Sequence, residues 1–231
     1  IDVDYIIDAG QLEQFIEDKT YIVSPMILTT ERPDKVASLL FEGRIAILVS
    51  GSPNALIVPA VFPDFMHSTE DLYMRYPYSA LIRFFRIPAL ILSILLPGLY
   101  LAIVLFHQEM IPTDLLFAIA AAREKVPFPL FIELLIMEIS FEIIREASLR
   151  TPEPVGPTLG IVGTLILGQA IVSASVVSPI LIIIVALTGI SSFAVANYSL
   201  NYTFRILRFI YIFLGYFAGF FGIAGGIFVN L

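Results

Sequence analysis

The second half of the chain is dominated by long apolar runs that contain no charged side chain. They cover residues 87–106, 156–177, 178–196 and 209–229. A helix of about twenty apolar residues is long enough to cross the ~30 Å hydrocarbon core of a bilayer. The pattern therefore predicts four membrane spans. Pro97-Gly98 predicts a kink in the first of them, tolerated where a neighbouring group satisfies the carbonyl that proline leaves free.

Residues 1–67 show a different pattern, in which short apolar segments alternate with turn-forming residues. We expect one helix at residues 10–19 and another that begins near Thr30 or Glu31, has Pro33 in its first turn and ends at Gly43. Residues 44–49 and 55–59 predict two strands of a hairpin. This part is interpreted as a portion of a soluble α/β subdomain. Residues 68–86 mix aromatic side chains with arginines and predict an amphipathic juxtamembrane helix.

Composition supports the membrane class. Of the 231 residues, 58% are hydrophobic and only 14% are charged, against about 25% in an ordinary soluble domain. The net charge of −7 and the lack of a basic run argue against a nucleic-acid partner. The chain starts with Ile1 and stops within an apolar run, so we expect a piece of a longer protein, truncated at the C-terminus. The predicted fold is an α-helical polytopic membrane protein, with spans in residues 87–231 and an N-terminal cytoplasmic α/β subdomain.

One predicted helix, residues 128–150, departs from the pattern of uncharged spans. It is rich in leucine and isoleucine, yet it carries four charged side chains on one stripe and a further glutamate off that stripe. A charge at the bilayer centre costs on the order of 2.5–3.5 kcal/mol, so these groups must pair, take up protons or face water. The candidate intramembrane polar site comprises Glu133, Glu138, Glu142, Arg145 and Glu146, together with Gln169 from the next span.

Two interpretations of this polar site stay open. In the functional interpretation, the carboxylates line a cation pathway or a subunit contact. In the structural one, they form ion pairs between helices, or the lower half of the helix lies in the cytoplasm; Arg145 can pair with Glu142 or Glu146. The basic residues favour a helix that crosses the membrane, because three groups of them then lie on the cytoplasmic side. Those groups are Arg75, Arg83 and Arg86; Arg145 and Arg150; and Arg205 and Arg208. Arg123 and Lys125 would lie on the other side, and Glu133 and Glu138 would be the deep carboxylates in need of a partner.

Glycines at the spacing of a helical turn predict close packing between spans. They are Gly156, Gly160, Gly163, Gly215 and Gly219. The sequence has only two histidines, both in predicted loops, and no catalytic, phosphate-binding, dinucleotide or metal-ligand pattern. We therefore expect neither an enzyme nor a bound cofactor or metal.

Several short stretches, in order along nearly the whole chain, resemble the A subunits of the GerA-type nutrient germinant receptors of endospore-forming bacteria. The clearest are residues 30–34 (TERPD), 40–44 (LFEGR), 126–129 (VPFP) and 137–147 (MEISFEIIREA). The chain departs from the family pattern at Asp71-Leu72-Tyr73, where two tyrosines are usual. It departs again at Ser173 and Ser175, so that any polar site built at Ser173 is in doubt.

The resemblance implies more than the residues do. Such subunits are multi-pass proteins of the inner spore membrane with a cytoplasmic N-terminal region. They contact membrane lipids, form homo-oligomers and work with a transporter-like B subunit and a lipoprotein C subunit. The implied function is a nutrient-gated ion-conducting component that triggers germination. The alternatives are a related sporulation membrane protein that modulates germination, a scaffold without conductance, and, last, a secondary transporter.

Overall fold

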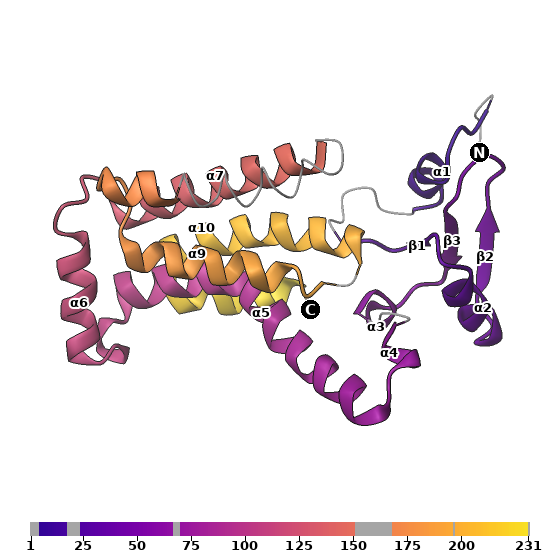
Figure 1. The fold of residues 1–231 in the computed structure, drawn as a ribbon, viewed down its shortest axis with the longest axis horizontal. Coiled ribbons are helices and arrows are strands. Elements are labelled where there is room, and N and C mark those ends of the chain that lie inside the picture. Colours follow the sequence, from indigo (N-terminus) through magenta and orange to yellow (C-terminus); the bar gives the residue numbers. More distant parts are fainter. Residues whose placement is uncertain (1–4, 18–23, 67–69, 151–167, 196, 231) are drawn as a thin grey trace. The chain divides into compact units, whose positions relative to one another are not determined.

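The structure is a computed structural model that describes residues 5–17, 24–66, 70–150, 168–195 and 197–230. The chain forms two compact units (Figure 1). The first contains residues 1–87 and 194–206, and the second contains residues 88–193 and 207–231. Two long helices, α5 (Tyr76–Phe106) and α10 (Tyr198–Asn230), each begin in the first unit and continue in the second.

The first unit is built on a three-stranded antiparallel sheet with the strand order β1-β3-β2. Strand β2 (Ile45–Leu48) pairs with β3 (Ala55–Val58), which confirms the predicted hairpin. The short strand β1 (Leu28–Thr30), which we did not predict from the sequence, pairs with the other edge of β3. Because β3 has a neighbour on both sides, Ala55, Leu56 and Ile57 are buried at the centre of the sheet.

Helices α1 (Ala9–Ile16) and α2 (Pro33–Phe41) contact the strands of the sheet. Helix α1 packs Ala9 and Leu12 against Leu56 of β3. Helix α2 has Pro33 at its first position, as predicted, but the residue at its cap is Arg32 instead of Thr30 or Glu31. The Thr30 hydroxyl accepts a hydrogen bond from the Arg32 N–H at 3.2 Å, which stabilises the turn that leads into the helix.

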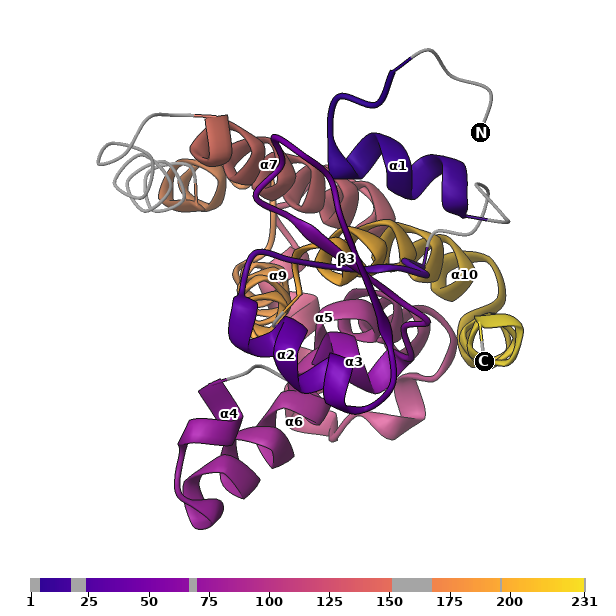
Figure 2. The same cartoon turned by 90° about the vertical axis from the view of Figure 1, so that its right-hand side faces the viewer.

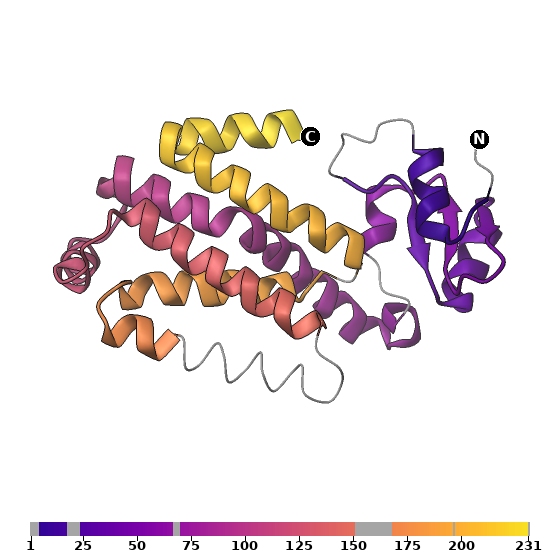
Figure 3. The same ribbon diagram turned by 90° about the horizontal axis from the view of Figure 1, so that it is seen from above.

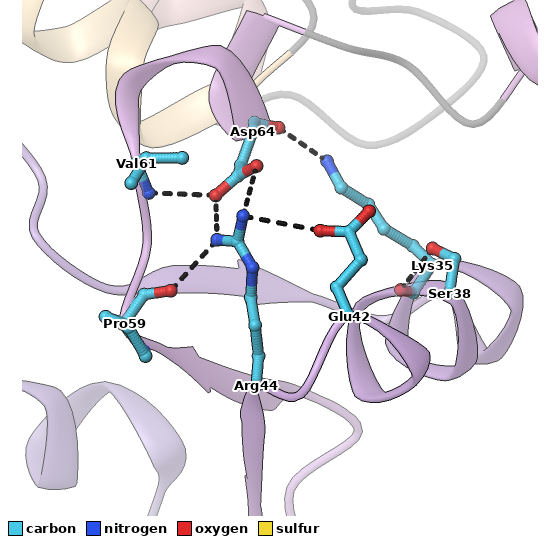
Figure 4. A network of polar contacts seen from close by, with 7 residues as sticks. All are labelled: Lys35, Ser38, Glu42, Arg44, Pro59, Val61 and Asp64. Carbon is cyan, nitrogen blue, oxygen red and sulfur yellow. Dashed lines mark hydrogen bonds and ion pairs between the residues drawn. The ribbon is translucent and has the colours of Figure 1, made fainter.

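A polar network fixes the segment that follows β3 (Figure 4). The Arg44 guanidinium donates to the Pro59 carbonyl at 2.9 Å and forms a two-pronged ion pair with Asp64 of α3 (Phe62–Met66). The same carboxylate accepts from the Val61 N–H at 2.8 Å, and Lys35 of α2 donates to the Asp64 carbonyl at 3.0 Å. These groups satisfy one another, so we interpret the network as structural. It is followed by α4 (Glu70–Tyr73).

The second unit consists of helices that run side by side (Figure 3). They are α5, α7 (Leu130–Arg150), α9 (Pro179–Ser192) and α10; Figure 2 shows α9 nearly end on and α7 and α10 obliquely. Their core includes Leu101 of α5, Leu134 of α7, Leu181 of α9 and Ile212 of α10, each of which is fully buried. Helix α6 (Thr113–Arg123) runs across the direction of the other helices (Figure 1).

Among the described residues, two helices, α5 and α10, are long and apolar enough to cross a membrane by length and composition. Residues 76–106 form one continuous helix, so the predicted juxtamembrane helix is not separate from the first span. Helix α9 has 14 residues and a length of roughly 21 Å. It is therefore shorter than the span predicted at residues 178–196. Of the span predicted at residues 156–177, the part from 156 to 167 lies outside the described residues, and residues 168–173 are helical.

Helix α10 corrects the last predicted span. Gly219 has φ 56° and ψ −138°, a conformation open essentially to glycine, and the helix reverses its direction there (Figure 3). The arm after Gly219 lies back along the arm before it, because Gly226 packs on Leu214 and Tyr211 and Asn230 reaches the Tyr211 hydroxyl. Residues 209–229 are therefore a helical hairpin and not one straight span.

Candidate functional site: two buried ion pairs on helix α7

Helix α7 begins at Leu130, two residues later than predicted, so that Pro127 and Pro129 both precede its first turn. The Pro129 carbonyl accepts the Glu133 N–H at 3.0 Å, which closes that turn. Glu133 thus lies in the first turn, where the free N–H groups and the helix dipole favour a negative charge.

Glu133 is completely buried, and both of its carboxylate oxygens have a donor. Arg123, the last residue of α6, donates its Nε to Oε1 at 3.0 Å. The main-chain N–H of Ser178 donates to Oε2 at 3.0 Å. Ser178 is the residue that precedes α9, so one side chain of α7 joins the end of α6 to the start of α9.

Glu138 forms the second buried pair. Its Oε2 lies 3.1 Å from Nη1 of Arg208 on α10, and each side chain is only 1% exposed. The Nε of Arg208 donates to the main-chain carbonyl of Ser93 on α5 at 2.8 Å. The pair therefore connects α7, α10 and α5 at one point.

Arg145 lies further along α7 and joins it to α9. Its Nη2 donates to the Ser192 hydroxyl at 2.7 Å, and its guanidinium lies over the rings of Phe141 and Phe193 at 5.0 and 5.4 Å. Such cation–π contacts stabilise a guanidinium that is withdrawn from water. Glu142 and Glu146, on the same stretch, are half-buried.

The structure thus divides the predicted site residues among separate contacts, with Glu133, which the sequence placed off the charged stripe, apart from Glu138. Glu133 and Glu138 occupy separate pairs, and Gln169 is exposed and belongs to neither. Among the predicted packing glycines, Gly215 lies against Gly98 of α5, where an added methyl group would come within 2.4 Å of the Gly98 carbonyl oxygen. Gly219 is instead the residue at which α10 reverses, and Gly156, Gly160 and Gly163 lie outside the described residues.

The arginine partners of the two deep glutamates were not identified from the sequence. Arg208 was interpreted as a cytoplasmic basic residue before the last span, but it is buried within α10, so it cannot serve as a marker of orientation. Arg123, which had counted against the orientation, is an ion-pair partner. A usable signal was present for Arg208, because Leu207, Phe209 and Ile210, all apolar, flank it directly in the sequence. Within the described parts of the chain, no three His, Asp or Glu side chains come together as a metal site would require.

Together these features define a helical protein that has two candidate membrane spans in its described parts and charges buried between its helices. The chain belongs to the Bacillus/Clostridium GerA spore germination protein family, whose family model matches residues 1–231.

Curated relatives agree with this assignment. The chain is 49% identical over 227 residues to spore germination protein KA of Bacillus subtilis (strain 168), covering 98% of this chain and 42% of the relative. It is 46% identical to spore germination protein GerLA of Bacillus cereus, over 95% of this chain and 45% of the relative. The uncharacterized membrane protein YfkQ of Bacillus subtilis (strain 168) is 46% identical, over 98% of this chain and 44% of the relative. The chain thus spans less than half the length of these relatives, and no solved structure matches it significantly.

Proposed function

We propose that this chain comprises a soluble subdomain and most of the membrane part of an A-type subunit of a nutrient germinant receptor. The family match over all 231 residues carries this proposal, and the names of the relatives place them in spore germination. Helices α5 and α10 support insertion in a membrane, as does the membrane protein named among the relatives. In this proposal the protein lies in the inner spore membrane as a multi-pass subunit, with the sheet-containing unit in the cytoplasm and residues 68–86 next to the membrane surface.

The proposal has a finer part, which concerns ion conduction. The subunit forms a homo-oligomer that conducts ions when a transporter-like B subunit binds the nutrient, with a lipoprotein C subunit completing the receptor. The chain acts as a receptor component and not as an enzyme. Because Glu133 and Glu138 are each paired with an arginine, their charges are neutralised within one copy of the chain. This favours a structural role for the deep carboxylates and leaves the conducting path to surfaces between copies.

Complementation tests the receptor role. Spores that lack the gene are expected to regain the nutrient response, followed as cation release and loss of optical density, when the full-length gene is restored. Spores that stay unresponsive, although the protein is present in the inner membrane, would contradict the role in nutrient-triggered germination. They would instead favour the related sporulation protein that only modulates germination.

Conduction is separated from a scaffold role by purified full-length protein in liposomes. A channel subunit is expected to give cation flux, and a scaffold is not. In spores, the Glu142→Ala variant distinguishes the same two roles. A channel effect changes the rate of ion release at an unchanged protein level, whereas a scaffold effect lowers the amounts of the B and C subunits that co-purify. Glu124→Ala, at an exposed site beyond α6, is the matched control.

A further inference from the structure

Pro97 creates an open hydrogen-bond acceptor in the middle of α5. Proline has no N–H, so the carbonyl four residues earlier in the helix, that of Ser93, loses its helical donor. Both proline and acceptor lie in the part of α5 that belongs to the second unit. Ser93 is fully buried, so water cannot replace the missing donor without entering the protein. A buried carbonyl left unpaired would lose its hydration without gaining a partner, which destabilises the folded state.

Arg208 supplies the missing donor from another helix. Its Nε donates to the Ser93 carbonyl at 2.8 Å, while its Nη1 contacts Glu138 at 3.1 Å. One guanidinium thus takes the place of an N–H of α5 and at the same time neutralises a carboxylate of α7. We call Ser93, Pro97, Glu138 and Arg208 the polar node.

The polar node is only partly satisfied. Within the described parts of the chain, Nη2 of Arg208 and Oε1 of Glu138 have no hydrogen-bond partner, although both atoms are buried. A buried ion pair of this kind adds little net stability, because the cost of removing its charges from water offsets their attraction. It does discriminate strongly between arrangements of the helices, because separating the partners leaves a charge buried and unpaired.

We propose that the polar node is a releasable link that holds α5, α7 and α10 in one resting arrangement, with the Ser93 carbonyl as the docking point of Arg208. Helix α5 lacks a main-chain hydrogen bond at this position, so a bend at Pro97 becomes easier when Arg208 leaves. The contact between Gly98 and Tyr211 lies beside the node and keeps α5 and α10 close in the docked state. In a receptor, a signal from a partner would act by separating Arg208 from Ser93 and Glu138, an assignment that rests on the proposed function.

Distances between helices in the full-length protein test the link directly. Residues 1–231 contain no cysteine, so spin labels can be attached at cysteines introduced at the exposed positions Leu105 on α5, Ile143 on α7 and Ile210 on α10. We expect one narrow distance distribution for each pair in the parent protein. Glu138→Gln and Arg208→Gln are expected to broaden or shift these distributions. Glu124→Gln and Arg205→Gln, which remove charges outside the node, are the controls and should leave them unchanged.

The Pro97→Ala background tests the docking point itself. Alanine restores an N–H at position 97 that can bond the Ser93 carbonyl, so Arg208→Gln should then change the distances much less than it does in the parent. An equal effect in both backgrounds would overturn the role of the Ser93 carbonyl. Unchanged distances in Glu138→Gln and Arg208→Gln protein that accumulates normally would overturn the link as a whole.

A triple variant keeps the test decisive if the single variants fail to accumulate. Pro97→Ala, Glu138→Leu and Arg208→Met together remove both charges and close the helix of α5, leaving no buried polar group of the node unpaired. We expect this protein to accumulate but to lose its single narrow distances, whereas narrow parental distances would contradict the link. Spores that carry it are expected to release cations without nutrient. A changed distance distribution with no effect on spores would support the link and argue against the receptor role.

Discussion

A glutamate that is fully withdrawn from water is tolerated only if its oxygens find donors, and Glu133 meets this condition with one charged and one main-chain donor. The main-chain donor is the more demanding partner. The Ser178 N–H is buried and cannot turn away to find another acceptor, whereas Arg123 is still 27% exposed and can reach water. The acceptor at position 133 therefore matters more than its charge.

A pair of substitutions separates these two contributions. Glu133→Ala leaves the Ser178 N–H without an acceptor and should lower stability by about 1–3 kcal/mol. Glu133→Gln keeps an oxygen that can accept from that N–H, so it should lower stability less than Glu133→Ala does. The measurement is the thermal unfolding midpoint of the full-length protein in detergent, with Glu124→Ala as an exposed control. Equal losses of stability in Glu133→Ala and Glu133→Gln would mean that the charge of Glu133, and not its hydrogen-bond acceptor, determines its contribution to stability.

A second prediction at this scale concerns Glu13 in the first unit. Partial burial raises the pKa of its carboxyl group; the hydrogen bond from Thr29 opposes this rise and the nearby Glu17 adds to it. Because the pKa of Glu13 is higher in the folded state than in the unfolded state, the folded state keeps its full stability below the unfolded pKa, near 4.5. Part of that stability is lost as the pH rises through the folded-state pKa and the buried carboxyl group ionises. Glu13→Gln, which keeps an oxygen for Thr29, should therefore stabilise this unit at pH 7 but not at pH 4.

Hydrogen exchange of peptides from α1 and β3, with variant and parent compared at the same pH, measures this effect. We expect slower exchange in the variant above pH 6 and no difference near pH 4. The Glu31→Gln variant, at an exposed position, should exchange at the same rate as the parent at both pH values. Faster exchange of Glu13→Gln at pH 7 would show that the ionised carboxylate is needed.

Among the elements, α5 and α10 approach each other so closely that their backbones touch. A methyl group on Gly98 would lie 2.5 Å from the Tyr211 carbonyl oxygen, and one on Gly215 would lie 2.4 Å from the Gly98 carbonyl oxygen. Small residues allow such a close approach, and dispersion attraction between the two backbones stabilises it. The backbone atoms at this contact cannot move aside as a flexible side chain could.

Alanine substitution in α10 tests this contact with an internal control. Gly215→Ala should force the two helices apart and lower stability by about 1–3 kcal/mol. Gly225→Ala places a methyl group in open space within the same helix, so stability should stay equal or rise by up to about 1 kcal/mol. Thermal unfolding and protein level in the membrane are the measurements. A Gly215→Ala protein as stable as Gly225→Ala would contradict the close approach.

The elements were more predictable than their contacts. Periodicity and turn residues were enough to predict the β2–β3 hairpin, the position of Pro33 in the first turn of α2 and the charged helix α7. The reversal at Gly219 could not be foreseen, because the apolar run continues through it without a polar residue. Arg208 and Glu138 are 70 positions apart in the sequence, so a pattern of neighbouring residues cannot predict that they pair.

At the scale of the whole chain, the division into two compact units constrains how the helices can cross a membrane. Residues 194–206 belong with residues 1–87, so α5 and α10 both start in the unit that holds the sheet. If both helices enter the membrane, they enter it from the same side. The loop after α5, with Gln108 and Glu109, then lies on the opposite side, and the reversal at Gly219 returns the arm that ends at Asn230 into the membrane.

Cysteine accessibility tests this topology in the intact membrane. A membrane-impermeant maleimide added from the cytoplasmic side of inverted vesicles should label cysteines placed at Tyr73 and Tyr198, both of which are exposed. Cysteine at Glu109 should be labelled only from the other side, because α5 separates it from Tyr73 by roughly 45 Å of helix. Cysteine at Asn230 should resist labelling from either side until detergent is added. Labelling of Tyr73 and Tyr198 from opposite sides would contradict a common side of entry, and rapid labelling at Asn230 would show that the arm after Gly219 does not return into the bilayer.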